Sequence, residues 1–576
     1  MKAKDWEICW VPPKEDVSCS RTLTKAFNLH PVLSKVFIAR GMKDVSSVRR
    51  FLYPNLSECS SPFGLPNIAE AVGRILRARR NQEKILVYGD NDVDGMTSVA
   101  LLVEFFQLLH MDVEYAFSGL SLNPLQASLA LVAKVQEKKA NLIVTVDWGT
   151  TAAKEISAVK NLDVDVVVTD HHEIIGKVPK EVLIVNPKIS QDYPNQELTG
   201  VGVAFQLAVA TLQSLVASGD LPKNHIDVYK FLDLVALGTI ADVGELVGEN
   251  RIFVSHGITL IRKGRRLGLR RLLEVLKINI DSVTAADLAL KVAPKLNSLG
   301  RLSNPEKGAE LLLSIDSIKA VQLVKQICEI DRDRRELERK ISQDVERVLK
   351  DNPEEGRKAA LVLASDTWHP RIVPIISAKF SKLYNRPVVI VSFSGEIGKG
   401  SARTHSNFPL LKVLKKCSES FLSFGGHNLA VGLSIRRKDF ASFKKKFIHL
   451  VQSSSQKKHR KESLFLDAEV DFSSLTYELL SSVELLEPFG RGNPSPVFFT
   501  TARQYRLPKL VAGSHIKVFL ENKGRHFEGV LFSMESRLKE LQSASNKELK
   551  VAYTPRIISS PFLGEVVQLL VRDFTF

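Results

Sequence analysis

The sequence predicts an α/β protein whose largest domain is a parallel sheet with helices on both faces, and three observations support this. From Lys84 to about Gly264, short apolar runs alternate with longer amphipathic stretches, the rhythm of strands separated by helices. The apolar runs have the length and composition of buried strands. Three of them stop at an acidic or histidine-bearing turn, at Asp90, Asp147 and Asp170.

Four runs are predicted as strands of this sheet, namely residues 85–88, 142–146, 164–168 and 182–185. Helical patterns such as residues 97–109 separate them. In open α/β sheets, ligands bind at the carboxyl ends of the strands. We therefore expect the turns at Asp90, Asp147 and Asp170 to converge on one crevice.

The rest of the chain predicts a long connecting helix and two further domains. Residues from about 314 to 350 are highly charged, with apolar positions near helical spacing, which is typical of a helix that joins two lobes. A second α/β segment follows, with strands at 359–364 and 387–393 and glycine-rich loops after them. Short β-like segments then predict a small barrel of the oligonucleotide-binding (OB) kind, at residues 516–520, 526–532, 549–553 and 566–571.

These elements define the expected domain organisation. The 576 residues correspond to three or four domains of ~150 residues each. We expect an N-terminal helical segment (residues 1–75) packed on the first α/β domain (76–313), and then the connecting helix (314–350). The second α/β domain (351–451), a linker (452–463) and the barrel (464–576) follow.

Composition narrows the expected partners and compartment. Lys and Arg number 80 against 64 Asp and Glu, giving a net charge of +16 and a pI near 9.4, which favours a polyanionic partner such as nucleic acid or an acidic membrane surface. The five cysteines are scattered, so neither a disulfide framework nor a zinc finger is expected. Because no signal peptide or run of ~20 apolar residues is apparent, we expect a cytoplasmic protein without a membrane partner.

The densest chemical signal is a run of three acids at alternate positions, Asp90, Asp92 and Asp94, where a strand leads into a helix. Hard divalent cations prefer oxygen ligands, and crowded carboxylates repel one another unless a cation compensates. A calcium loop of the EF-hand kind needs a bidentate Glu at its twelfth position, whereas residues 97–102 continue as an apolar helix. A helix cap needs one acid rather than three, so the run favours a metal site.

Later turns carry further candidate ligands. Asp147 and Asp242 each end an apolar run, and either one, taken alone, is equally consistent with a helix cap or turn residue. In the triplet Asp170-His171-His172 the neighbouring imidazoles diverge, so one can bind metal while the other meets substrate. Together these carboxylates and histidines, which we expect at strand ends, form an oxygen-rich set. Such a set favours Mn²⁺ or Mg²⁺ over Zn²⁺ and suffices for two ions that share a bridging carboxylate.

The order of these motifs resembles the DHH phosphoesterase superfamily. Further stretches are similar to the RecJ family within it, a family of single-strand-specific 5′→3′ DNA exonucleases. These stretches are residues 198–205, 248–251, 297–302, 368–370, 398–403, 424–427 and 486–494. They follow the family's order over nearly the whole chain, and they imply a DHH domain, a DHHA1 domain and a C-terminal OB domain.

The resemblance implies a role for each candidate residue. It implies a metal-binding set of Asp90, Asp92, Asp94, Asp147, His171 and Asp242. In this set Asp147 bridges the two ions, and Asp90 is either a ligand or a support for the ligands. His172 joins Asp147 as a catalytic residue, because the family's second histidine contacts the scissile phosphate and stabilises developing charge, while Asp170 supports the ligands. The implied substrate-binding residues are Asn297, Arg301, Ser401, Arg403, Gly425, Gly426 and His427.

The implied function is a two-metal exonuclease that degrades single-stranded DNA 5′→3′ to 5′-mononucleotides in recombination and repair, with a helicase and a single-strand-binding protein as partners. The barrel would offer a basic groove with stacking aromatics, for which Lys517, Arg525 and Phe527 are candidates. Two alternatives remain. An oligoribonuclease or nucleotide phosphatase of the superfamily would lack the barrel and the 486–494 motif, and an inactive scaffold that binds DNA and protein partners would lack metal ligands.

Overall fold

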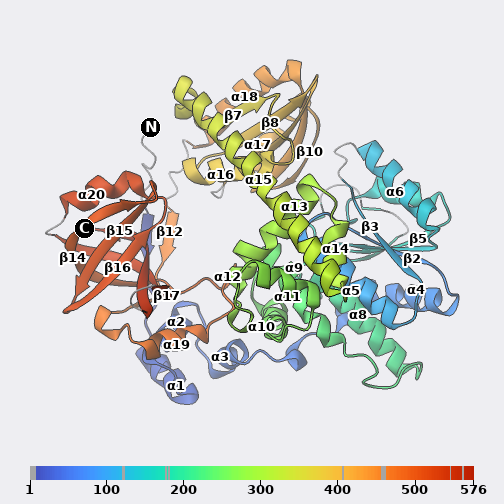
Figure 1. Ribbon diagram of the computed structural model, residues 1–576, viewed down its shortest axis with the longest axis horizontal. Helices are drawn as coiled ribbons and strands as arrows, with labels where there is room; N and C mark the ends of the chain where they lie inside the picture. Colours follow the sequence, from blue (N-terminus) through green and yellow to red (C-terminus); the bar gives the residue numbers. More distant parts are fainter. Residues whose placement is uncertain are drawn as a thin grey trace. The chain divides into compact units, whose positions relative to one another are not determined.

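The computed structural model describes residues 8–119, 124–174, 178–179, 182–404, 408–455, 462–544, 547–560 and 564–576. The chain divides into two units, and Figure 1 labels their helices and strands. The metal-centre unit, as we call it below, comprises Arg49–Asp333 and Leu486–Ser495. The second unit comprises Arg334–Leu485, Pro496–Phe576 and the residues up to Val48.

A five-stranded parallel sheet of order β3-β2-β4-β5-β6 lies at the centre of the metal-centre unit. Its strands are β2 (Ile85–Gly89), β3 (Val113–Phe117), β4 (Leu142–Val146), β5 (Asp165–Thr169) and β6 (Leu183–Val185). The predicted parallel sheet is confirmed. The sequence pattern did not predict β3, because this edge strand is partly exposed and carries a charged residue. The strand order reverses between β2 and β4, and such a switch point is where open α/β sheets bind ligands.

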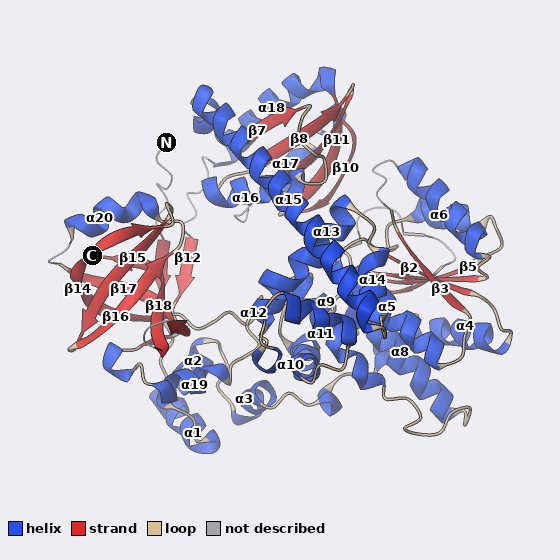
Figure 2. Cartoon of the chain, viewed as in Figure 1, coloured by secondary structure: helices blue, strands red, loops and turns tan. Residues whose placement is uncertain are grey.

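Helices cover both faces of this sheet (Figure 2). Ile85 and Val87 point into the larger core, which is formed with helices α4 (Ile68–Arg80), α5 (Val93–Leu108), α8 (Gly200–Ala217) and α9 (Leu232–Ala241). Leu86 and Tyr88 point into the other core, beneath α6 (Pro124–Lys138) and α7 (Ala153–Lys160). This alternation is what buries β2 on both faces.

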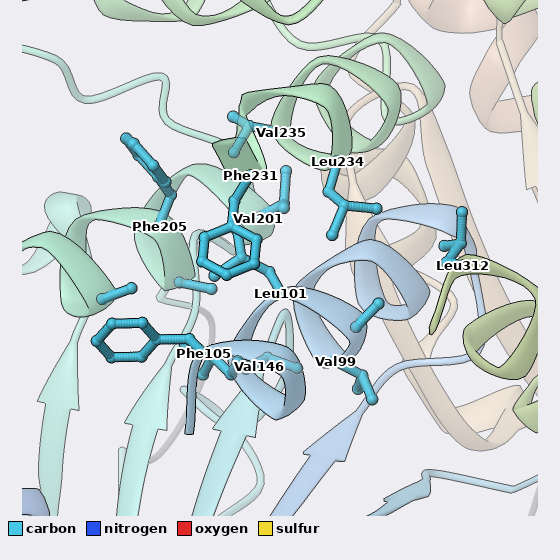
Figure 3. Close-up of a cluster of buried hydrophobic side chains, with 14 of the residues drawn as sticks. Val99, Leu101, Phe105, Val146, Val201, Phe205, Phe231, Leu234, Val235 and Leu312 are labelled. Atoms are coloured by element: carbon cyan, nitrogen blue, oxygen red, sulfur yellow. The ribbon is translucent and has the colours of Figure 1, made fainter. Parts of the chain in front are cut away.

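The larger core packs α5, α8 and α9 together against the sheet. Figure 3 shows Leu101 and Phe105 of α5 among side chains from the other elements, including Val146, Val201, Phe205, Phe231 and Leu234. By length and composition α8 is apolar enough to cross a membrane, but 72% of it is buried inside this core. Its apolar character is therefore explained by core packing.

Five shorter helices complete this unit, α10 (Gly248–Arg262), α11 (Leu267–Val275), α12 (Ala285–Asp287), α13 (Ala293–Leu302) and α14 (Glu306–Leu313). Helix α3 (Val45–Leu52) precedes α4. Helix α15 (Ser317–Asp351) is 35 residues long and continues from the metal-centre unit into the second unit. Its span agrees with the predicted connecting helix.

The second unit contains a five-stranded mixed sheet of order β10-β11-β9-β8-β7. Its strands are β7 (Leu361–Ser365), β8 (Val388–Ser394), β9 (Ile397–Arg403), β10 (Phe421–His427) and β11 (Ala430–Arg436), and its helices are α16 (Val373–Tyr384), α17 (Leu410–Lys415) and α18 (Arg437–Ser455). The prediction of glycine-rich loops here was wrong, because those glycines lie within strands. A Cβ on Gly398 would lie 2.7 Å from Phe393, and one on Gly400 would lie 2.8 Å from Leu433. These glycines therefore allow neighbouring side chains to pack over the strand.

The C-terminal part of the second unit is a barrel, as predicted. Its sheet has the order β13-β14-β15-β16-β18-β17, and β14 also pairs with β17, which closes it. The strands are β13 (Ala468–Glu469), β14 (Phe498–Val511), β15 (His515–Asn522), β16 (Arg525–Leu531), β17 (Glu548–Ser560) and β18 (Gly564–Thr575), accompanied by helices α19 (Tyr477–Glu484) and α20 (Leu538–Ser543). The sequence pattern did not predict β14, in which buried positions alternate with polar, exposed ones.

Three segments differ from what the sequence suggested. We expected residues 1–75 to pack on the first α/β domain, but β1 (Ile8–Val11) pairs with β12 (Glu462–Phe465). Helices α1 (Val17–Phe27) and α2 (Pro31–Ala39) belong to the same second unit, where Arg40 Nε lies 3.0 Å from Asp467 Oδ1. The expected linker begins as the end of α18, and its residues 456–461 lie outside the described residues. Leu486–Ser495, which we placed with the barrel, belongs to the metal-centre unit. Such pairings join residues hundreds of positions apart, which local periodicity does not report.

Candidate metal centre

Carboxylates and imidazoles converge at the carboxyl ends of β2, β4 and β5. Their potential ligand atoms form three overlapping groups, in each of which all atoms lie within 4.8 Å of one another. The groups are Asp147, His171 and His172; Asp94, His171 and Asp242; and Asp90, Asp92 and Asp147. The structure thus brings together every residue that the sequence analysis assigned to metal. One expectation was wrong in detail, because Asp242 follows helix α9 rather than a strand.

The β2–α5 turn positions three of the acids. Asp92 is the N-cap of α5 and accepts a hydrogen bond from the Gly95 N–H at 3.2 Å. The turn requires glycine at position 95, because a Cβ there would lie 2.2 Å from the backbone oxygen of Asp90. Asp94 lies in the first turn of the helix, where the positive end of the helix dipole stabilises negative charge.

Asp94 is held by the start of α8, a contact that the sequence analysis did not predict. The N–H groups of Gly200 and Val201 donate to its two carboxylate oxygens at 2.8 and 2.9 Å. The first N–H groups of a helix have no partner inside the helix and are available for such an anion. The signal in the sequence was Thr199-Gly200 before a long apolar run, which is a helix start. Gly200 also lets α8 approach Asp147, since a Cβ on it would lie 2.6 Å from the Asp147 Cβ.

Asp147 has an unusual backbone and an unpaired carboxylate oxygen. Its φ is 56°, in the left-handed region that Asp tolerates better than most residues. Its side chain is buried, and Oδ1 has no hydrogen-bond partner among the described residues, although His171 Nε2 lies 3.1 Å away. Buried carboxylate oxygens without partners are rare in folded proteins. A cation bound at Oδ1 would satisfy this one.

His171 Nε2 faces carboxylates from three other elements. It lies 3.1 Å from Asp147 Oδ1, 3.8 Å from Asp242 Oδ2 and 3.9 Å from Asp94 Oδ2. One imidazole nitrogen surrounded by carboxylate oxygens matches the ligand preference of Mn²⁺, and the oxygens alone match that of Mg²⁺.

Asp170 is saturated by hydrogen bonds from its own turn and from the turn that follows β4. Its Oδ1 accepts from the N–H groups of His171 and His172, at 2.7 and 3.2 Å, and lies 2.7 Å from His172 Nδ1. Its Oδ2 accepts from the Thr150 N–H at 2.8 Å. Burial raises the pKa of Asp170, but the hydrogen bond and charge of His172, the Thr150 N–H and the charge of His171 together outweigh burial and hold this pKa well below its usual range. Burial lowers the pKa of His172, but its hydrogen bond with Asp170 and the charges of Asp170, Asp90 and Asp242 together outweigh burial and raise that pKa to about 9.

The remaining acids resist ionising together. Burial, followed by the charge of a neighbouring aspartate, raises the pKa of Asp90, Asp94 and Asp147. Burial and the charge of Asp92 raise the pKa of Asp242 to about 7. Carboxylates crowded in a buried site lose this penalty when a divalent cation neutralises them. The donor set, its charge and the unpaired Oδ1 therefore fit two hard divalent cations.

The predicted substrate residues fall into two groups. Asn297 and Arg301 lie on α13 in the metal-centre unit, where Asn297 Oδ1 accepts from the Val93 N–H at 3.1 Å. Gly300 on the same helix packs directly on the β2–α5 turn, since a Cβ there would lie 1.8 Å from the Asn91 oxygen.

The other group lies on the mixed sheet of the second unit. There Ser401 pairs with Gly432, which pairs with Gly425. One step along, Ala402 pairs with Val431, which pairs with Gly426, and next Arg403 pairs with Ala430, which pairs with His427. The side chain of His427 lies outside the described residues. The predicted residues Ser401, Arg403, Gly425, Gly426 and His427 therefore occupy consecutive rows across β9, β11 and β10.

The parallel sheet and its acid-rich carboxyl edge define a phosphoesterase of the DHH class, and comparison with known families agrees. The chain matches the DHH family N-terminal domain over residues 84–239, the DHHA1 domain over 357–453 and the RecJ OB domain over 466–573. It is 32% identical to the single-stranded-DNA-specific exonuclease RecJ of Haemophilus influenzae, over 94% of this chain and 96% of that protein. The chain belongs to the RecJ family.

Further relatives agree with this assignment. The chain is 30% identical to RecJ of Bacillus subtilis over 92% of its own length and 66% of that protein. Among solved structures it is similar to RecJ of Thermus thermophilus in complex with Mn²⁺, with a TM-score of 0.83 and 25% identity over 99% of this chain and 80% of that one. An exonuclease RecJ bound to manganese matches 67% of the chain at 30% identity, with a TM-score of 0.56.

Proposed function

We propose that this protein is a metal-dependent exonuclease that degrades single-stranded DNA 5′→3′ to 5′-mononucleotides in recombination and repair. The observation that carries the phosphodiesterase chemistry is the buried Asp147 Oδ1, which has no hydrogen-bond partner among the described residues and faces His171. The substrate is inferred from the relatives, which are named single-stranded-DNA-specific exonucleases. The 5′→3′ polarity and the role in repair rest on the family resemblance alone.

The proposed metal ligands for Mn²⁺ or Mg²⁺ are Asp90, Asp92, Asp94, Asp147, His171 and Asp242. Asp147 and His171 each belong to two of the three groups, which supports Asp147 as the carboxylate shared between two ions. When bound, two such ions neutralise charge on the attacking and leaving oxygens of an in-line displacement at phosphorus. The α8 N-terminus supports this chemistry by fixing Asp94 through two backbone N–H groups.

We assign His172 the role of donating a hydrogen bond from its charged imidazole ring to the scissile phosphate. Asp170 engages Nδ1 and keeps the ring charged near neutral pH, so Nε2–H is the donor left for a phosphoryl oxygen. A fixed donor aimed where charge develops costs little reorganisation during the reaction. Asp170 acts here by orienting His171 and His172, since its own oxygens are already engaged.

We propose that Asn297, Arg301, Ser401, Arg403, Gly425, Gly426 and His427 bind the DNA backbone, and that the barrel binds the strand further along. The barrel carries the exposed ring of Tyr505, with its centroid 4.7 Å from that of His526, and Lys517, whose Nζ lies 2.7 Å from Glu528 Oε2. Such rings and cations bind single strands by stacking and charge. Phe527 is a poorer candidate than the sequence suggested, because it packs against the buried Phe472 at 5.3 Å.

The domain boundaries, the cytoplasmic location and the partners remain part of this proposal. A helicase would supply single strands and a single-strand-binding protein would deliver them. The barrel argues against a small-substrate phosphatase, and the intact acid cluster argues against an inactive scaffold.

A direct test uses single-stranded DNA labelled at either end, with Mn²⁺ or Mg²⁺ and with a chelator. We expect metal-dependent release of the 5′ label first, and loss of cleavage by about 100-fold or more in Asp147→Ala, as for other transition-state stabilising groups. Asp220→Ala is the matched control, because Asp220 is an exposed residue hydrogen-bonded only locally to Ser218. Cleavage with chelator, or unaffected by Asp147→Ala, would refute the two-metal assignment, and release of the 3′ label first would refute the polarity.

A further inference from the structure

The Leu486–Ser495 loop, part of which the sequence analysis singled out without assigning a role, belongs to the unit that contains the metal centre. The buried Arg251 of α10 holds its start, donating to the Glu487 oxygen at 2.8 Å. Asn493 Nδ2 donates to the oxygens of Leu486 and Pro488, both at 2.8 Å. The loop is therefore held by its backbone in one conformation.

This loop packs on residues 242–247, which lead from Asp242 of the metal centre to α10. The Leu246 N–H donates to the Arg491 oxygen at 2.7 Å. The glycines on either side of Arg491 allow the approach, because a Cβ on Gly490 would lie 2.7 Å from Leu246 and one on Gly492 would lie 3.0 Å from Val247. Arg491 is thus fixed beside the segment that carries a proposed ligand.

The Arg491 side chain is exposed, while its backbone makes the loop's contacts. It is 60% exposed, and its Nη2 lies 3.1 Å from Glu245 Oε1. Glu245 stands three positions beyond Asp242, so this contact holds the guanidinium on the segment that carries a proposed metal ligand. A guanidinium has five N–H donors, and one contact with Glu245 leaves most of them for another group.

Two functions for this side chain can be compared. As a structural tie to Glu245 it would contribute only about 0–1 kcal/mol, the usual value for an exposed ion pair. As an anion receptor it is well suited, because arginine grips phosphate with paired N–H donors. The exposed cation at the rim of a buried acidic cluster also offsets repulsion between that cluster and an incoming polyanion.

We infer that Arg491 is a substrate-binding residue that grips a backbone phosphate of the DNA strand on the Asp242 side of the metal centre. This inference rests on the proposed function. The glycines and Arg251 hold the loop that presents the guanidinium, and the exposed ion pair with Glu245 is a weak contact that substrate can replace. The charge acts on binding of the strand, so its loss changes KM more than kcat.

The test compares Arg491→Ala, Arg491→Lys and Glu245→Gln with Arg347→Ala, which removes another exposed arginine, paired with Asp344 at 2.7 Å on α15. We expect Arg491→Ala to raise KM for single-stranded DNA about tenfold, to leave kcat within about twofold, and to reduce the salt slope of kcat/KM by about 1. Arg491→Lys restores the charge and recovers part of the loss. Glu245→Gln and Arg347→Ala leave KM within about twofold of wild type.

Equal rises in KM for Arg491→Ala and Glu245→Gln would show that the ion pair merely holds the loop, and an unchanged KM and salt slope in Arg491→Ala would also overturn the inference. Equilibrium binding of a fluorescent single strand at several salt concentrations measures the same loss without cleavage. A wild-type protein that binds the strand but does not cut it would refute the proposed function, while the difference in binding between wild type and Arg491→Ala would still decide the role of Arg491.

Discussion

Gly200→Ala tests the claim that the start of α8 sets the position of Asp147. The added methyl group would lie 2.6 Å from the Asp147 Cβ and 2.7 Å from its Oδ1. Because non-bonded carbon atoms lie about 3.5–4.0 Å apart, Asp147 or the helix must move by about 1 Å. A displacement of about 1 Å in a catalytic group can cost ~100-fold in rate, and we expect that loss in kcat/KM for single-stranded DNA.

The expected change in stability is small by comparison. Overpacking costs about 1–3 kcal/mol, while replacing Gly by Ala in a helix returns about 1 kcal/mol. The variant should therefore fold and melt within a few degrees of wild type while cleaving poorly. The assay is steady-state cleavage with Mn²⁺, together with thermal unfolding and a titration of metal affinity.

Gly202→Ala is the matched control, one position beyond Val201 on the same helix. Its Cβ would lie 3.1 Å from the end of the Leu198 side chain, which can rotate away. The three atoms nearest to this Cβ belong to Leu198 and Thr199, neither of which is a proposed ligand. We expect activity within about threefold of wild type for this control. Near-normal cleavage by Gly200→Ala, or an equal loss in both variants, would refute the geometric argument.

Three further predictions follow from the site. Asp170→Asn removes a carboxylate that helps to raise the pKa of His172 to about 9. The alkaline limb of the pH–rate profile should therefore shift to lower pH, and kcat should fall about 100-fold at pH 8. An unchanged limb would exclude His172 as the titrating group. In metal-free protein the pKa of Asp242 is raised to about 7, so folding is favoured while Asp242 is protonated and stability falls as pH rises from about 4 through 7. Thermal unfolding should show this fall, and Mn²⁺ at ~100 Kd should add about 2.7 kcal/mol at pH 8 and less at pH 5. Arg251→Ala removes the hydrogen bond to the Glu487 oxygen and the stacking of the guanidinium on the Phe51 ring at 3.6 Å. The free energy of unfolding, measured with denaturant, should fall by about 2–4 kcal/mol. A fall below about 1 kcal/mol would show that the 486–495 loop does not depend on Arg251.

The sequence by itself determined the core of the parallel sheet and singled out, as candidate metal ligands, the residues that the structure brings together. Strands β2, β4, β5 and β6 are continuous apolar runs, because helices bury them on both faces. The acids after β2 stand at alternate positions, a pattern that favours a cation site because crowded carboxylates repel one another. Strand β3 and the glycine-rich strands β9 and β10 lack that apolar signature, since an edge strand is half exposed and glycine offers no side chain to read.

Only the tertiary structure decided how these residues act together. The α8 N-terminus reaches Asp94 across 106 positions of sequence, and the 486–495 loop returns to residues 242–247 after more than two hundred. Asp170, to which the family resemblance already assigned support of the ligands, accepts hydrogen bonds from its own turn and from Thr150, 20 positions away in sequence. Local periodicity reports what a segment buries, whereas the partner of each charge depends on which distant segments pack against it.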